Sequence, residues 1–169
     1  GSGVSERILG EVLEGRRGDV VLVSKFGHTP EGATDFSVDW FRDSLDGSLK
    51  RLRTDYLDVL LLHNPPSEMY AGTDPLWAAM EEARAQGKIR HFGASLDFAT
   101  EVEDCLANTD SEVLEVLFNV LHQDVRRSFV GIGGNLPLTD DLPISISQRA
   151  CVVITVESIQ SSTGRTLSR

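Results

Sequence analysis

The sequence has few of the features that mark secreted, metal-binding or membrane proteins. Its 169 residues include two cysteines, Cys105 and Cys151, which have neither the spacing of a metal site nor the number of a disulfide framework. The four histidines are not paired at close spacing, so no metal is expected. No apolar run approaches the roughly 20 residues that a membrane helix needs, and no signal peptide pattern is present. We therefore expect a cytoplasmic protein that does not enter a membrane.

Positive charge is also scarce. The chain has 16 Lys and Arg against 26 Asp and Glu, a net charge of −10, which argues against nucleic acid or an anionic membrane as its main partner. The remaining composition, 40% hydrophobic and 25% charged, is that of an ordinary globular protein with enough apolar residues for one core.

The acidic excess lies in one part of the chain. Residues 129–169 hold three acids and three bases, so the first 128 residues carry the whole net charge of −10. The later stretch is also rich in Ser, Thr, Gly and Pro. We therefore expect a boundary near Phe129, with 129–169 a non-matching, flexible tail from a shifted reading frame or a fused unrelated end. Within it, residues 152–156 could form one β-segment.

Helical and strand patterns alternate along the first part. The predicted helices begin at four capping residues, and the predicted strands are four apolar runs: helix caps Ser5, Ser37, Asp74 and Asp97; strands 19–25, 59–62, 89–95 and 113–121. The first helix has an apolar face of Ile8, Leu9, Val12 and Leu13. Strand starts roughly 25–40 residues apart suit right-handed βα crossovers. This order predicts a parallel α/β sheet, either open or closed into a barrel.

Two of these strands end in a titratable residue. Lys25 follows the first apolar strand and His63 follows the second. In parallel α/β folds functional residues collect at these carboxyl ends, and an ammonium at the edge of an apolar strand is costly unless it is paired or used. Two interpretations stay open from the pattern alone: a catalytic pair, or a lysine that reaches solvent and a histidine bonded to its loop.

Longer motifs surround both residues. They are Gly3-Val4-Ser5-Glu6 with Leu9-Gly10, Val-Ser-Lys-Phe-Gly at 23–27, the segment from Ser44 to Pro66, Gly87-Lys88-Ile89-Arg90 with Gly93-Ala94-Ser95, and Leu117-Phe118-Asn119-Val120-Leu121. In this order, over residues 3 to about 128, they resemble the aldo-keto reductase family.

The resemblance implies part of a (β/α)₈ TIM barrel, about strands three to six with their helices, within residues 1–128. It implies an NADPH-dependent oxidoreductase that reduces small aldehydes and ketones. Lys25 matches the family's catalytic lysine, and His63 matches the histidine that orients the substrate carbonyl. Ser95 matches a residue that bonds the nicotinamide. A neutral imidazole suits His63's role, because it can hydrogen-bond a carbonyl oxygen.

The sequence departs from the family at several positions. Glu115 stands where the sixth strand usually offers a glutamine to the cofactor, and a carboxylate accepts hydrogen bonds but cannot donate them. The family's proton-donating tyrosine and its aspartate precede the motif that begins here at Gly3. Tyr56 is expected to serve packing and Tyr70 to have no proton role. We therefore expect no measurable carbonyl reduction by these 169 residues alone.

The alternative hypothesis is a non-catalytic remnant. Half a barrel leaves two apolar sheet edges open, which predicts self-association or aggregation through those edges. Four further side chains are expected to be structural: His28 solvated in a loop, His91 satisfied in the core, and Trp40 and Trp77 packed on helices, although a tryptophan near a loop could line a substrate pocket.

Overall fold

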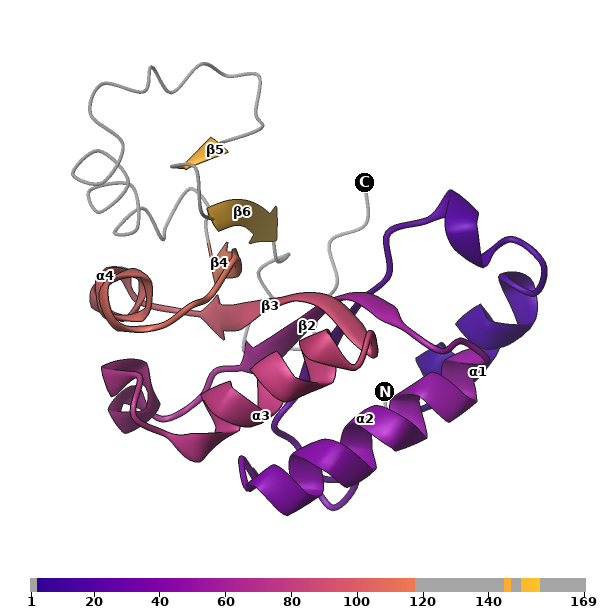
Figure 1. The fold of residues 1–169 in the computed structure, drawn as a ribbon, viewed down its shortest axis with the longest axis horizontal. Helices are drawn as coiled ribbons and strands as arrows, with labels where there is room; N and C mark the ends of the chain where they lie inside the picture. Colours follow the sequence, from indigo (N-terminus) through magenta and orange to yellow (C-terminus); the bar gives the residue numbers. More distant parts are fainter. Residues whose placement is uncertain (1–2, 118–144, 147–149, 156–169) are drawn as a thin grey trace, which may run out of the picture.

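The computed structural model describes residues 3–117, 145–146 and 150–155, and the helices and strands alternate as the sequence predicts (Figure 1). The elements are α1 (Val4–Val12), η1 (Arg17–Asp19), β1 (Val23–Phe26), α2 (Val38–Leu52), β2 (Leu57–His63), η2 (Ser67–Ala71), α3 (Pro75–Ala85), β3 (Ile89–Leu96), α4 (Ala99–Asn108), β4 (Val113–Leu117), β5 (Ser145–Ile146) and β6 (Ala150–Thr155). Within this part of the chain no helix is long and apolar enough to cross a bilayer.

The described strands form one sheet in the order β1-β2-β3-β4-β6-β5. Neighbouring strands from β1 to β6 are parallel, and the short β5 runs antiparallel to β6. The register places His63 opposite Ser95 and Ser95 opposite Glu115, so the carboxyl ends of β2, β3 and β4 lie at one edge of the sheet. The predicted parallel sheet is confirmed.

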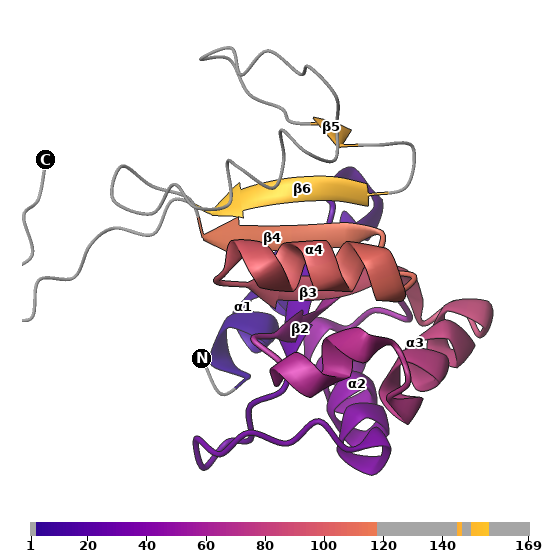
Figure 2. The ribbon, with the colours of Figure 1, turned by 90° about the vertical axis from the view of Figure 1, so that its left-hand side faces the viewer.

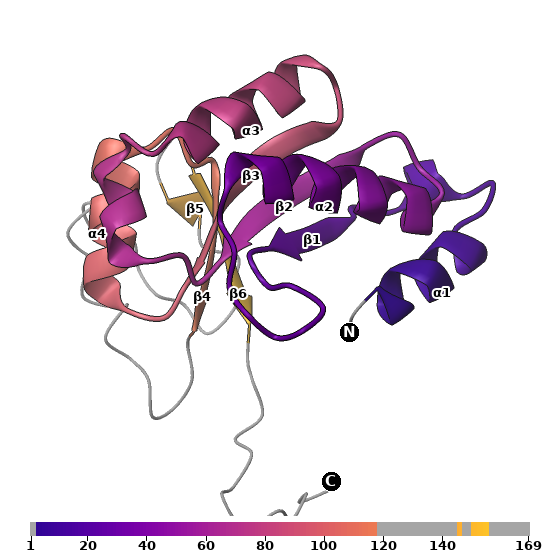
Figure 3. The same cartoon turned by 90° about the horizontal axis from the view of Figure 1, so that it is seen from below.

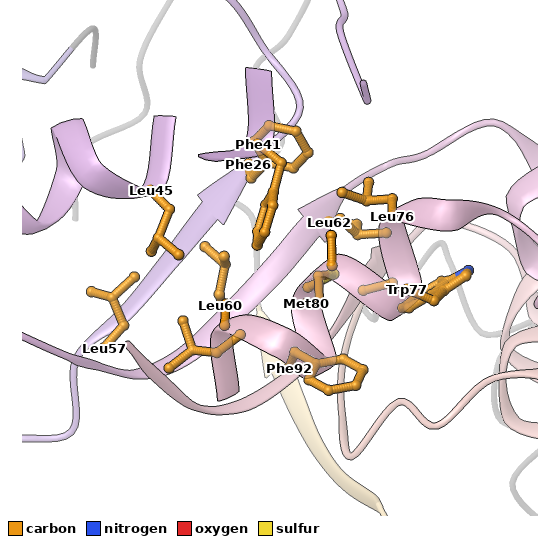
Figure 4. Close-up of a cluster of buried hydrophobic side chains, with 14 of the residues drawn as sticks. Phe26, Phe41, Leu45, Leu57, Leu60, Leu62, Leu76, Trp77, Met80 and Phe92 are labelled. Atoms are coloured by element: carbon orange, nitrogen blue, oxygen red, sulfur yellow. The ribbon is translucent and has the colours of Figure 1, made fainter. Parts of the chain in front are cut away.

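One face of the sheet is covered by helices and forms the main core. Helices α2 and α3 lie across β2 and β3, and α4 runs beside β4 (Figures 2 and 3). Apolar side chains of the strands and helices meet between the two layers, as Figure 4 shows: Phe26, Phe41, Leu45, Leu57, Leu60, Leu62, Leu76, Trp77, Met80 and Phe92. The Phe26 ring contacts Phe41 edge-on, with ring centres 5.5 Å apart. Burial of this apolar surface is what stabilises the layers against each other.

The opposite side of the sheet, which we call the inner face, has a much smaller apolar cluster of Val59, Leu61 and Val113. Gly93 lies between Leu61 and Val113 in the register. A Cβ atom on Gly93 would meet the Val113 carbonyl oxygen at 1.7 Å, so only glycine fits this close approach of β3 to β4.

Two of the predicted helix caps are confirmed. The Ser37 hydroxyl accepts a hydrogen bond from the Trp40 amide at the start of α2, and the Asp74 carboxylate accepts one from the Leu76 amide at the start of α3. Pro75 occupies the first turn of α3, where the lost amide hydrogen costs nothing. These local signals fix where both helices begin.

The other two caps are wrong. Gly3, not Ser5, precedes α1. At α4 the Glu101 carboxylate accepts hydrogen bonds from the amides of Asp97 and Phe98, while the Asp97 carboxylate accepts one from Asn64. Phe98 therefore takes the N-cap position, and a glutamate one turn into the helix reaches back to accept from the amides at the helix entry.

The first strand and the first helix also differ from expectation. Strand β1 begins only at Val23, because Arg17–Asp19 form η1 and the Leu22 amide donates to the Asp58 side chain. The apolar face of α1 stays exposed, with Ile8 56% accessible. The buried residue of α1 is Gly10, which lies against the backbone of Arg51 and Leu52.

One of the two predicted open edges is covered. Strand β6 pairs in parallel with β4, so the expectation of an exposed edge there is wrong. The β-segment expected within the tail corresponds to β6, and most of residues 129–169 lie outside the described residues. At the other end of the sheet, no strand among the described residues pairs with the outer edge of β1 (Figure 3).

Candidate active site

A cavity of about 880 Å³ opens at the carboxyl ends of β1, β2 and β4. Three of the four predicted site residues line it: Lys25, His63 and Glu115. They come from three different strands, so they meet because of the fold. Lys25 and His63 therefore share one opening, as the sequence motifs require, and their catalytic roles stay predictions.

Lys25 and Glu115 form an ion pair, with 2.5 Å between Nζ and Oε1. In a flat sheet β1 and β4 would stand roughly 14 Å apart across two intervening strands. The pair therefore shows that the sheet curls toward its inner face. The Glu115 side chain is only 11% exposed and that of Lys25 32%. A carboxylate this buried requires a cation, and Lys25 supplies it.

His63 lies at the end of β2 with the His28 ring beside it, 4.7 Å between ring centres. Burial lowers the pKa of His63 below its ordinary value, and the nearby positive charges of Lys25 and His28 lower it further. Glu115 and Asp97 act in the opposite direction but do not outweigh these effects. The imidazole is therefore neutral near neutral pH and able to hydrogen-bond a carbonyl oxygen.

Ser95 does not share the surface of the cavity. It lies between His63 and Glu115 in the sheet and is buried. Ser95, the fourth predicted site residue, thus neighbours His63 and Glu115 in the sheet but does not line the cavity.

A second buried ion pair forms the wall beside β1. Arg51 of α2 donates to Glu6 of α1 over 2.6 Å, and the Ser24 hydroxyl of β1 donates to the other Glu6 oxygen over 3.0 Å. These contacts join α1, α2 and β1 around the cavity. Trp40 also lines it, which matches the pocket alternative for this residue. Trp77 is a core residue whose indole N–H donates to the Met69 carbonyl.

Neither tyrosine of the chain reaches the cavity. The Tyr56 ring lies between the guanidinium groups of Arg17 and Arg90, 4.0 and 4.1 Å from its centre. The Tyr70 hydroxyl is buried and donates to the Pro65 carbonyl, and burial raises the pKa of Tyr70. The sequence has two tyrosines in all, so these 169 residues offer no phenol to the cavity.

Two histidines behave differently from expectation. His91 is not in the core: its side chain is largely exposed, and its Nδ1 lies 3.1 Å from a Glu112 carboxylate oxygen. It stands at the opposite end of β3 from Ser95, where solvent reaches the sheet. His28 is exposed, as expected of a loop residue, but it also contacts His63. Among the described residues no three His, Cys, Asp or Glu side chains are arranged to hold a metal ion.

Sequence reasoning missed that Glu115 is the partner of Lys25. A usable signal was present, since each is a lone charge in an otherwise apolar strand, and buried opposite charges tend to pair. The contact of His28 with His63 had no comparable signal, because it depends on the path of the loop between β1 and α2.

Comparisons with known proteins agree with this geometry. The model of the aldo/keto reductase family matches residues 1–130. Methylglyoxal reductase YeaE of Escherichia coli is 43% identical over 98 residues, which cover 57% of this chain and 32% of that protein. The chain spans about a third of the length of this and two other curated relatives that it matches.

Solved structures show the same fold. An aldo-keto reductase of Bacillus halodurans in its holo form superposes with a TM-score of 0.68 at 27% identity, covering 77% of this chain and 45% of that one. An aldo-keto reductase of Klebsiella pneumoniae in complex with NADPH gives 0.55 at 30% identity, covering 69% and 39%. The predicted fold class, part of a (β/α)₈ barrel, is confirmed.

These findings define the class of protein: an α/β domain of parallel strands with a cavity at their carboxyl ends. The chain belongs to the aldo/keto reductase family.

Proposed function

We propose that this chain is the lysine- and histidine-bearing part of an NADPH-dependent reductase of small aldehydes and ketones. The observation that carries the proposal is the meeting of Lys25, His63 and Glu115 at one cavity, in a chain of this family. The similarity to a methylglyoxal reductase and to a structure with bound NADPH supports the substrate class and the cofactor.

The residues present suit such a reaction in part. NADPH, when bound, supplies the hydride for the carbonyl carbon. Neutral His63 donates a hydrogen bond to the carbonyl oxygen, and the Lys25 ammonium favours negative charge developing in the cavity. A nicotinamide amide could donate to Glu115, which only accepts, so the carboxylate fits one half of the carboxamide.

We further propose that residues 1–169 alone do not catalyse measurable carbonyl reduction. Tyr56 and Tyr70 are both engaged outside the cavity, so the proton donor must come from outside these residues. The test is NADPH oxidation with a panel of aldehydes that includes methylglyoxal, beside NADPH fluorescence titration for binding. We expect NADPH to bind without being oxidised. Turnover that disappears in Lys25→Met or His63→Ala would contradict the proposed inactivity.

A second candidate function is association with another chain through the free edge of β1. Apolar residues at or just before the start of β1 are exposed, Val21 by 76% and Val23 by 42%. An unpaired strand edge with apolar neighbours favours pairing with another strand.

Charge placed on this edge tests the association. In sedimentation velocity we expect the wild type to self-associate and Val21→Lys/Val23→Lys to shift toward monomer, because edge lysines oppose strand pairing. Phe98→Lys is the matched control, since Phe98 is exposed at the start of α4, away from β1. A monomeric wild type, or an equal effect of Phe98→Lys, would argue against association through β1.

A further inference from the structure

The loop that carries His28 is held firmly against the site. Gly27 has a left-handed φ of 131°, and a Cβ there would meet the Phe36 ring at 2.5 Å. The Gly27 carbonyl accepts from the Asp35 amide, and His28 forms a β-bridge with Thr34. Phe36 in turn packs edge-on against Phe26 of β1, 5.8 Å between ring centres. The loop is thus closed on itself and fastened to the core, so the place of His28 is set by the fold.

This anchored position brings His28 against His63. The two rings lie 4.7 Å apart between centres, tilted by 56°, and both line the cavity. A ring packed on another ring loses freedom to rotate, so His28 limits the orientations of the His63 imidazole. His28 is the more exposed of the two, and His63 is half-buried at the strand end.

The charged groups around His63 come from every element that surrounds it. Lys25 projects from β1, His28 from the following loop, Glu115 from β4, and Asp97 from the turn after β3. Lys25, although paired with Glu115, also lowers the pKa of His63, and among these groups it is His28 whose ring contacts the His63 ring. A positive charge on His28, whenever it is protonated, opposes a second charge on His63 at this short distance.

We propose that His28 is a positioning residue, which holds the His63 imidazole in one orientation and in its neutral form at the cavity. The value of this arrangement for a carbonyl substrate rests on the proposed function. The contact between the rings does not, and it can be tested without turnover.

The experiment is an imidazole titration by long-range ¹H–¹⁵N NMR on the whole chain between pH 4.5 and 8.5. His28→Phe keeps a ring beside His63 but removes its charge, and His28→Ala removes both. His91→Asn is the matched control, because His91 is an exposed histidine at the other end of β3. His63→Asn assigns the signals.

We expect His28→Phe to raise the pKa of His63 toward its ordinary value and His91→Asn to leave it unchanged. We expect a single neutral tautomer of His63 in the wild type and a mixture of both tautomers in His28→Ala. A structural role alone would not move the titration. If both His28 variants titrate at His63 as the wild type does, the proposal is overturned, and His28→Gln replaces either variant that fails to fold. A shifted titration in a protein that never binds NADPH would sink the proposed function and leave this inference standing.

Discussion

The two ends of β2 place their charges in opposite ways. At its start, Asp58 is enclosed by partners: Arg17 and Arg90 each approach a different carboxylate oxygen at 2.8 Å, and the Leu22 amide donates over 2.8 Å. At its end, the half-buried His63 lies beside the His28 ring and lines a cavity. A fully partnered charge stabilises the fold, whereas a polar side chain that faces a cavity is available to a ligand. The chain separates these two tasks along seven residues of one strand.

The sharpest way to break this comparison is Asp58→Ala. The Asp58 side chain is 10% exposed, and its removal takes away the acceptor of the Leu22 amide and the anionic partner of Arg17. We expect the free energy of unfolding to fall by about 3–5 kcal/mol, as for other buried pairs that lose one partner. Urea denaturation measures it. Asp46→Ala, which breaks the exposed pair with Lys88, is the control and is expected to cost about 0–1 kcal/mol. Equal losses would contradict a special role for Asp58.

Acid provides a second test of the same end. Burial tends to raise the pKa of Asp58, but the Leu22 amide and the Arg17 and Arg90 cations outweigh it, so the pKa is lowered from its ordinary 3.8. A lowered pKa contributes stability that is complete above the ordinary value and is lost as pH falls through the folded one. The stability difference between wild type and Asp58→Asn should therefore shrink below about pH 4. Urea titrations at several acidic pH values would refute this if the difference stayed constant to pH 2.

The smallest expected effect lies at the cavity end. Glu115→Gln keeps the shape of the side chain and removes its charge, so the ion pair becomes a hydrogen bond from the Lys25 ammonium to a neutral amide oxygen. Because Lys25 stays partly exposed, we expect a loss of about 1 kcal/mol or less. A double-mutant cycle with Lys25→Met isolates the coupling between the two side chains. A loss as large as that of Asp58→Ala would show that this end is built for stability too.

Much of the architecture was predictable because its signals are local. Apolar runs between turn residues located β2 and β3, and a serine and an Asp-Pro pair fixed the starts of α2 and α3. The failures depended on tertiary contacts. Strand β1 starts late because Arg17–Asp19 form η1 and the Leu22 amide bonds to the Asp58 side chain. Most of the apolar face predicted for the first helix is exposed, because α1 packs against α2 through Gly10.

The candidate site was also predictable only in part. Lys25 and His63 stand at recognisable strand ends, and the structure brings both to one cavity. The pairing of Lys25 with Glu115 is suggested by two lone charges in separate strands, but their sequence spacing does not fix it, because it depends on how strongly the sheet bends. The contact of His28 with His63 was not predictable, because the path of its loop is set by Gly27, Phe26 and Phe36, which pack together only in the folded chain.

The missing side chain of Gly93 has a consequence for anyone who would redesign this protein. Since β3 can approach β4 only where no methyl group intervenes, that single position governs the radius of the sheet. Any larger residue would push the backbones of β3 and β4 apart and flatten the sheet. The ion pair between Lys25 of β1 and Glu115 of β4 would then be broken. The absence of a side chain at Gly93 thus helps to set the shape of the cavity.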